Sequence, residues 1–290
     1  MRRTLAFLVG LAMYAALVPG VAYSQNPEWI NYTSGAEICA LADEGDYLWF
    51  GGGGLTRLNK ATGEMTLYNS ANSGLPSNTV FALATDSAGD KWIGTWDGGL
   101  AKFDGAHWTV YNTENSGLPS NHIKSLAIDS AGNKWIGTYG AGLAKFDGAN
   151  WTVYNSDNSG LPDNHVFALV IDSAGNKWIG TYGGGLAKFD GAHWMVYNTE
   201  NSGLPSNYIR SFAIDSGGSK WIAISDGLAK FDGVNWTVYN TGNSGLPSDF
   251  VLTLAIDSAD DKWIGTQRGG LAEFDGAHWT VYNTENSGLP

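Results

Sequence analysis

A repeat of about 43 residues constrains this chain more than any other feature of its sequence. The tryptophan of a KWIG, KWIA or LWF run recurs with spacings of 43, 43, 43, 43 and 42 residues, at Trp49, Trp92, Trp135, Trp178, Trp221 and Trp263. The proline of an SGLP run recurs in the same phase, at Pro76, Pro119, Pro162, Pro205, Pro247 and Pro290. Such a period is typical of an array of similar units that bury their apolar faces against one another.

Each unit contains four short apolar runs separated by turn residues. In the third unit we predict strands at 122–128, 134–138, 142–146 and 151–155. The segments between the first two and the last two runs, DSAGN and DGAN, carry the Asp, Asn and Gly that hairpin turns need. Four antiparallel strands in this period are typical of a β-propeller blade. The prediction is an all-β propeller with units at about 36–69, 79–112, 122–155, 165–198, 208–240 and 250–283.

The composition agrees with this fold class. Gly accounts for 40 of 290 residues, about twice the usual share of ~7 %. The chain has 13 Trp, 13 Tyr and 11 Phe but only 15 % charged residues, which excludes a disordered chain. We expect the repeated tryptophans to pack between blades, because large flat rings fill the gap between stacked sheets. The same role is expected for a second series, Trp108, Trp151, Trp194, Trp236 and Trp279.

The two ends of the repeat array suggest a larger ring. The segment 28–33 matches the fourth strand of a unit that lacks its first three strands, and 287–290 matches the opening of a seventh unit. Propellers commonly close by letting an N-terminal strand complete the last blade. We therefore expect a seven-bladed ring in which this sequence is truncated at its C-terminus.

The first 24 residues have the layout of a secretory signal peptide. Two arginines precede an apolar run at 5–18, and small residues follow at Gly20, Ala22 and Ser24. We expect export to the periplasm or the extracellular space, with the propeller at 25–290 and no membrane span besides the leader. The net charge of −12 argues against nucleic acid as a partner. With Cys39 as the single cysteine, no internal disulfide is expected.

The segment 75–105, LPSNTVFALATDSAGDKWIGTWDGGLAKFDG, resembles the two-component regulator propeller repeat. That family occurs in extracytoplasmic sensor regions of bacterial hybrid histidine kinases and in related secreted proteins. The resemblance extends over all six units, because the proline, the turn aspartate, the tryptophan and the glycine pair recur in order. It implies a ligand-sensing propeller, with oligosaccharides as the usual ligand class, and a downstream kinase region that is not present here.

Two units depart from the repeat in their first turn. In the first unit Asp43 keeps the turn aspartate, but Glu44, Gly45 and Asp46 replace the usual Ser-Ala-Gly. In the last unit Asp260 stands where the others have glycine. The repeat therefore does not predict the turn geometry at these two places.

Differences among the units locate a candidate binding site. Positions that are identical in every unit serve the blade, whereas positions that differ are free to serve a ligand. The differences concentrate at the start of the first strand and in the second turn, which lie at the same end of a propeller. Aromatic rings there can stack on sugars, and the cations can pair with carboxylate or sulfate groups. The candidate ligand-binding residues are Trp96, Asp97, His122, Lys124, Tyr139, His165, Tyr182, Tyr208, Arg210, Gln267 and Arg268.

Catalysis and metal binding have less support. His122 and His165 occupy equivalent places on adjacent blades and can act as acid–base groups or as metal ligands, but a third fixed ligand is missing. One turn aspartate per blade supplies too few oxygens for calcium, so Asp86, Asp129, Asp172, Asp215 and Asp257 are assigned to turn capping. His107, His193 and His278 are likewise assigned to turns.

We therefore predict a non-catalytic exported sensor propeller that recognises a carbohydrate-like ligand, with no metal and no cofactor. Two alternatives stay open. One is a propeller lyase that uses His122 or His165, and the other is a secreted structural or protein-interaction propeller.

Overall fold

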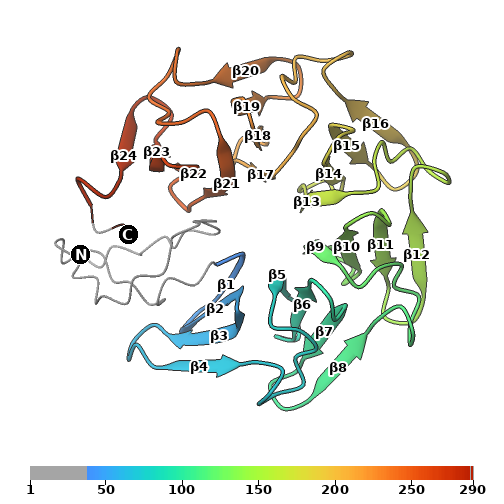
Figure 1. Ribbon diagram of the computed structural model, residues 1–290. Coiled ribbons are helices and arrows are strands. Elements are labelled where there is room, and N and C mark those ends of the chain that lie inside the picture. The colour runs from blue at the N-terminus through green and yellow to red at the C-terminus, as the bar shows by residue number, and fades with distance from the viewer. Residues whose placement is uncertain (1–37, 288, 290) are drawn as a thin grey trace.

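The computed structural model describes residues 38–287 and 289, which form six four-stranded antiparallel sheets. Each sheet is a simple meander in which strands pair in chain order. Figure 1 shows the six sheets arranged around a central axis, with the first strand of each sheet nearest the axis and the fourth at the periphery. The described residues are therefore a β-propeller of six blades.

The strand bounds repeat from blade to blade. The innermost strands are β1 (Ala40–Glu44), β5 (Val80–Thr85), β9 (Ile123–Ile128), β13 (Val166–Ile171), β17 (Ser211–Ile214) and β21 (Val251–Ile256). The second strands are β2 (Tyr47–Gly52), β6 (Lys91–Thr95), β10 (Lys134–Thr138), β14 (Lys177–Thr181), β18 (Lys220–Ile224) and β22 (Lys262–Thr266). The third strands are β3 (Gly54–Asn59), β7 (Leu100–Phe103), β11 (Leu143–Phe146), β15 (Leu186–Phe189), β19 (Gly227–Phe231) and β23 (Gly270–Phe274). The outermost strands are β4 (Met65–Tyr68), β8 (Trp108–Tyr111), β12 (Trp151–Tyr154), β16 (Trp194–Tyr197), β20 (Trp236–Tyr239) and β24 (Trp279–Tyr282).

The predicted blade is confirmed closely. In the third unit each observed strand begins and ends within one residue of its predicted bounds. The predicted signal peptide at 1–24 and the orphan strand at 28–33 lie outside the described residues. The described part of the chain contains six blades, and a seventh blade stays a prediction.

The first five repeated tryptophans pack between blades, as predicted, whereas Trp263 of the sixth blade is partly exposed. Trp178 is 2 % exposed and lies in an apolar cluster with Phe212, Ile222 and Phe231 of the next blade. Its ring also stacks on Tyr197 of its own blade, at a centroid distance of 6.0 Å. The tryptophans of the second series stack on the Phe at the end of the third strand, at 4.5 Å for Trp194 and Phe189.

Each turn aspartate joins the first hairpin to this packing. The carboxylate of Asp129 accepts the indole N–H of Trp135 at 2.9 Å and the backbone N–H groups of Ala131 and Asn133. Lys177 of the next blade places its Nζ 4.7 Å from the centre of the Trp135 ring. The indole bond recurs at Asp86, Asp172, Asp215 and Asp257. The turn-capping role is confirmed.

The first blade builds this contact differently. The sequence aligns Asp43 with the turn aspartate but does not predict the turn geometry, and in the structure Glu44 makes the contact instead. Glu44 accepts the indole N–H of Trp49 at 2.7 Å and pairs with Lys91 of the next blade at 2.6 Å, whereas Asp43 pairs with Lys60. The reason is a shorter hairpin, in which Glu44 pairs directly with Tyr47 and Gly45 has a φ of 58°. Glu44, one residue after Asp43, therefore makes the contact with the tryptophan that an aspartate makes in the other blades.

The last blade keeps the ordinary turn despite its missing glycine. Asp260 adopts a left-handed φ of 70°, close to the 80° of Gly132 in the same position of the third unit. Asp tolerates this region better than most residues, because its short polar side chain can bond locally. Its carboxylate accepts the N–H of Ser216 in the fifth blade at 2.9 Å and lies 2.9 Å from Nζ of Lys262.

Candidate functional site

The two variable segments of each unit meet at one end of the propeller. The backbone N–H of Tyr139, just after β10, donates to the carbonyl of His122, just before β9, at 2.9 Å. The same bond joins Tyr182 to His165 at 3.0 Å and Gln267 to Phe250 at 2.9 Å. The structure thus brings the second turn next to the entry of the inner strand, as the sequence predicts.

A β-bulge near the start of the inner strand leaves one residue without an opposite partner in β5, β9, β13 and β21. In β5, Val80 pairs with Thr95 and Ala82 with Gly94, which leaves Phe81 without an opposite residue. Strand residues on either side alternate toward the neighbouring blades, and a bulge re-aims the extra residue. The equivalent residues of all six blades line one cavity, and we call them the channel ring: Cys39, Phe81, Lys124, Phe167, Arg210 and Leu252.

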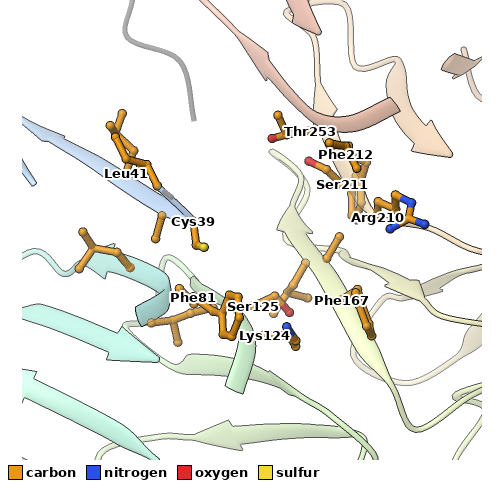
Figure 2. A pocket seen from close by; sticks show the side chains of 18 residues that line it. Cys39, Leu41, Phe81, Lys124, Ser125, Phe167, Arg210, Ser211, Phe212 and Thr253 are labelled. Atoms are coloured by element: carbon orange, nitrogen blue, oxygen red, sulfur yellow. The ribbon is translucent and has the colours of Figure 1, made fainter. Parts of the chain in front are cut away.

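The cavity is about 410 Å³ and receives residues from all six innermost strands. Figure 2 shows Lys124, Phe81 and Phe167 on one side of it and Cys39 and Thr253 on the other. Among the described residues, the charged side chains of the lining are Lys124 and Arg210. This part of the lining is cationic in a chain whose net charge is −12.

A line of rings runs along the mouth of the channel, and we call it the aromatic arc: Trp96, His122, Tyr139, His165, Tyr182 and Tyr208. Trp96 meets Tyr139 edge to face at 5.4 Å, and Tyr139 meets His165 at 4.6 Å. Phe167 of the channel ring lies 6.0 Å from Tyr139 and stacks on Tyr182 at 4.9 Å. Tyr182 then meets Tyr208 at 5.0 Å. The arc crosses the second to fifth blades, and its three tyrosines are 42–47 % exposed.

Both channel cations lie against aromatic rings. The Nζ of Lys124 is 3.5 Å from the centre of the Phe81 ring and 4.4 Å from that of Trp96. The guanidinium carbon of Arg210 is 4.4 Å from the centre of Phe250, and its Nη2 is 3.5 Å from Oγ of Ser225. The Nε of Arg210 is buried and has no hydrogen-bond partner among the described residues. Contact with ring faces holds a cation in place.

Each histidine of the arc lies beside a carboxylate. His122 Nε2 is 3.4 Å from Asp97 Oδ1, and His165 Nδ1 is 3.2 Å from Asp163 Oδ1. Residues 38–287 and 289 contain no group of three or more His, Cys, Asp or Glu side chains that could hold a metal ion. The outer histidines have turn positions as predicted, with His107 beside Asp104 at 3.3 Å, for example.

The structure gathers most of the predicted site residues but not all of them. Gln267 and Arg268 lie on the corresponding loop of the sixth blade, where Arg268 has a left-handed φ of 63°, and the aromatic arc does not reach them. Two residues that the sequence-based set omits, Phe81 and Phe167, join the arc to the channel. They could have been found because they share the repeat position of Lys124. Asp163 was also missed, although it is an aspartate where other units have serine in LPSN.

Among the described residues, no helix is long and apolar enough to cross a membrane. A family model described as the two component regulator propeller matches residues 117–140 and 160–183. No curated protein matches the chain.

Solved structures show the same architecture. The extracellular domain of a hybrid two component system from B. thetaiotaomicron is 26 % identical, with a TM-score of 0.75 over 89 % of this chain. A second such domain from that organism is 20 % identical, with a TM-score of 0.69 over 84 % of this chain. The present chain covers only 36 % and 34 % of those two chains.

An enzyme shares the fold as well. Virginiamycin B lyase from Staphylococcus aureus has a TM-score of 0.69 at 11 % identity, over 87 % of this chain and 85 % of the lyase, which shows the fold alone. The family match identifies two units, at residues 117–140 and 160–183, as similar to the two component regulator propeller repeat, and all six blades share the four-stranded pattern of these two.

Proposed function

We propose that this protein is an exported, non-catalytic propeller that binds a carbohydrate-like ligand on its aromatic arc, as the sensor region of a two-component signalling protein. The observation that carries the proposal is the arc itself, a line of partly exposed rings across four blades at the mouth of a cavity of about 410 Å³. Cavities of about 300–1,000 Å³ lined by rings and a few polar groups are usual for small ligands.

The chemistry of the arc suits a sugar. Tyrosine rings offer apolar faces to the C–H faces of pyranoses and hydroxyls to their oxygen atoms. The carboxylates of Asp97 and Asp163 lie beside the two histidines and can accept bonds from sugar hydroxyls. The arc is open enough to receive a ring, since Tyr139 and Tyr182 are each 42 % exposed.

The sensor role and the export rest on similarity. The structures from B. thetaiotaomicron are extracellular domains of hybrid two component systems, and their resemblance covers most of this chain. N-terminal sequencing of the secreted protein tests export, and a mature chain beginning near residue 23 or 25 is the expected result.

The proposal includes a seventh blade. Trp178 and Trp221 are 2 % exposed because the next blade covers them, whereas Trp263 remains partly exposed among the described residues. A further blade beside Trp263 would complete the pattern. A form of the protein extended by one repeat should show a blue-shifted tryptophan emission relative to the Trp263→Phe variant of the same form.

Calorimetry with a panel of neutral di- to tetrasaccharides tests the arc. We expect at least one to bind, and Tyr182→Ala and Tyr139→Ala to weaken it by about tenfold or more, as loss of a stacking ring generally does. His193→Ala is the control, because that ring lies on an outer turn with 87 % of its side chain exposed. Equal affinity in the wild type and both tyrosine variants would contradict the placement of the site.

The two His–carboxylate pairs favour a second candidate, a lyase in which His122 or His165 abstracts a proton. A neighbouring carboxylate orients an imidazole and stabilises the positive charge that the ring gains when it accepts a proton as a general base. Product formation that disappears in the His122→Ala/His165→Ala double variant would support the lyase. Binding without turnover would support the sensor.

A further inference from the structure

The aromatic arc contains the same arrangement of two rings three times. In each copy, a ring just after the second strand of one blade meets, edge to face, a ring just before the inner strand of the next blade. We call these contacts the ring pairs: Trp96 with His122 at 4.7 Å, Tyr139 with His165 at 4.6 Å, and Tyr182 with Tyr208 at 5.0 Å. Their interplanar angles are 66°, 77° and 69°. The arc is therefore a row of three similar corners.

The period of the sequence produces this repetition. The rings after the second strands are 43 residues apart, and so are the rings before the inner strands. One step along the blades thus carries a pair to an equivalent place around the axis. The row ends within the described blades, because Gly53 and Thr79 occupy the position before the first pair and Ser225 stands where a tyrosine would continue the row.

The fold does not require rings at these places. The backbone bond from the second turn to the entry of the inner strand is 2.9 Å long with Tyr139 and equally 2.9 Å with Gln267. Between the first and second blades, Gly53 and Thr79 form a β-bridge in place of a ring pair. The tyrosines of the pairs are 42–47 % exposed, so burial explains only part of their presence. Exposed apolar surface gathered in one place is typical of a binding site.

Each ring pair has a shape that suits one pyranose. Two rings at a steep angle form a corner, in which one ring can carry the C–H face of a sugar while the other bounds its edge. Carboxylates stand beside the first two corners: Asp97 Oδ1 is 3.4 Å from His122 Nε2, and Asp163 Oδ1 is 3.2 Å from His165 Nδ1. The third corner has the hydroxyl of Tyr208. These oxygens can bond the hydroxyls of a sugar.

Neighbouring ring pairs adjoin one another. Trp96 meets Tyr139 at 5.4 Å, so the first two pairs are in direct contact. Phe167 lies 6.0 Å from Tyr139 and 4.9 Å from Tyr182, so it fills the step between the second and third pairs. A bound chain can therefore pass from corner to corner over a continuous line of rings.

We propose that the aromatic arc is a row of three similar subsites, one for each ring pair, and that it binds three consecutive units of a linear oligosaccharide with a uniform linkage. This inference rests on the proposed function, because it takes the arc to be the carbohydrate site. Corners that repeat from blade to blade present similar walls at each step, so they match a ligand whose own units repeat.

Ladders of cello-, malto- and xylo-oligosaccharides from one to five units test the inference by calorimetry. We expect one ladder to bind, with an affinity that rises about tenfold from the disaccharide to the trisaccharide and by less than about twofold beyond it. The length at which the affinity stops rising reports the number of subsites, because a fourth unit has no ring pair to contact.

Variants at the two ends and in the middle of the row separate the subsites. Trp96→Ala and Tyr208→Ala each remove an end pair, so they should lower the affinity for the trisaccharide about tenfold and change that for the disaccharide by less than about twofold. Tyr139→Ala removes the middle pair and should weaken both lengths. His278→Ala is the control, because that ring lies on an outer turn with 83 % of its side chain exposed. All three arc variants should fold, since none of these rings is fully buried.

The outcomes distinguish this inference from the proposed function. An affinity that does not rise from the disaccharide to the trisaccharide, or that keeps rising through the fifth unit, overturns the three subsites and leaves the carbohydrate site standing. End variants that weaken the disaccharide as much as the trisaccharide have the same consequence, because a single indivisible site gives that result. Absence of binding by all three ladders overturns both proposals.

Discussion

The same strands form two ends of the propeller: the end with the first hairpin turns, which we call the turn end, and the channel mouth. The residues of the turn end are nearly the same in every blade, whereas those of the channel mouth vary. At the turn end, an aspartate, a tryptophan and a lysine meet in nearly the same way in blade after blade, as Asp129, Trp135 and Lys177 do. At the channel mouth, the residues at equivalent positions differ among blades, as Lys124, Phe167 and Arg210 do on three adjacent blades. The difference teaches that packing between identical blades permits few solutions, whereas the mouth is free to differ.

One stretch of chain makes the contrast concrete. Trp178 in β14 is 2 % exposed and belongs to an apolar cluster shared by two blades. Tyr182, just after the same strand, is 42 % exposed, and its ring meets those of Phe167 and Tyr208 at the channel mouth. The first residue serves stability and the second is available to a ligand.

Removing these two side chains should give the largest difference in the free energy of unfolding. Trp178→Ala deletes a buried ring between blades and should lower the free energy of unfolding by about 3–5 kcal/mol. Tyr182→Ala removes partly exposed ring contacts and should cost less than about 1.5 kcal/mol. Urea denaturation followed by circular dichroism measures both. A Tyr182→Ala cost equal to that of Trp178→Ala would show that the mouth also holds the fold together.

Two aspartates, one at each end of the propeller, should show the same difference in stability with a smaller magnitude. Asp129 accepts the Trp135 indole N–H and two backbone N–H groups, so Asp129→Ala leaves these donors unpaired and should cost about 1–3 kcal/mol. Asp97 is 67 % exposed in its side chain and lies beside His122, so Asp97→Ala should change stability by less than about 0.5 kcal/mol. The midpoint of urea unfolding distinguishes them. Equal losses would refute the division of roles.

The fold was predictable because the same strand and turn pattern recurs in each unit, which resolves assignments that one short segment leaves open. Any one run such as KWIGT is too short to assign alone, but four copies in phase with turn residues fix the strands to within a residue in the third unit. The failure in the first blade has the same origin. Without a matching turn, alignment with the repeat selected Asp43, and it could not show that a shorter hairpin passes the contact to Glu44.

The site was predictable in position but not in shape. Comparison of the units located the variable positions, and the geometry brings Trp96, His122, Tyr139 and His165 together. The bulge that turns Phe81 and its equivalents toward the axis leaves no composition signal, because it depends on register between strands. Separation into an aromatic arc and a cationic channel ring therefore required coordinates.

Acid should weaken the repeated turns, and this effect is the smallest and most gradual of those expected. Backbone N–H groups of His193 and Ala192 hold the pKa of Asp190 at about 2, and Asp104 and Asp275 are held at about 2 in the same way. Burial raises the pKa of Asp129, but bonds from Trp135, Asn133 and the backbone outweigh it, so the net pKa lies below the usual value.

These lowered pKa values fix the direction of the pH effect. A carboxylate that stays ionised in the folded state while the unfolded chain takes up a proton stabilises the fold fully above the ordinary pKa of 3.8. That stabilisation is lost as the pH falls from about 4 toward 2, through the folded-state values. Thermal unfolding at pH 6, 4, 3 and 2 should therefore show a falling midpoint below pH 4. Asp190→Asn keeps a hydrogen-bond acceptor but removes the charge. The unfolding temperature of this variant should therefore fall less steeply below pH 4, by the part that Asp190 contributes. An unfolding temperature that does not change down to pH 2 would mean that the turn carboxylates are no better bonded in the folded chain than in the unfolded one. Interblade packing would then be the sole stabiliser of the end that carries the repeated turns.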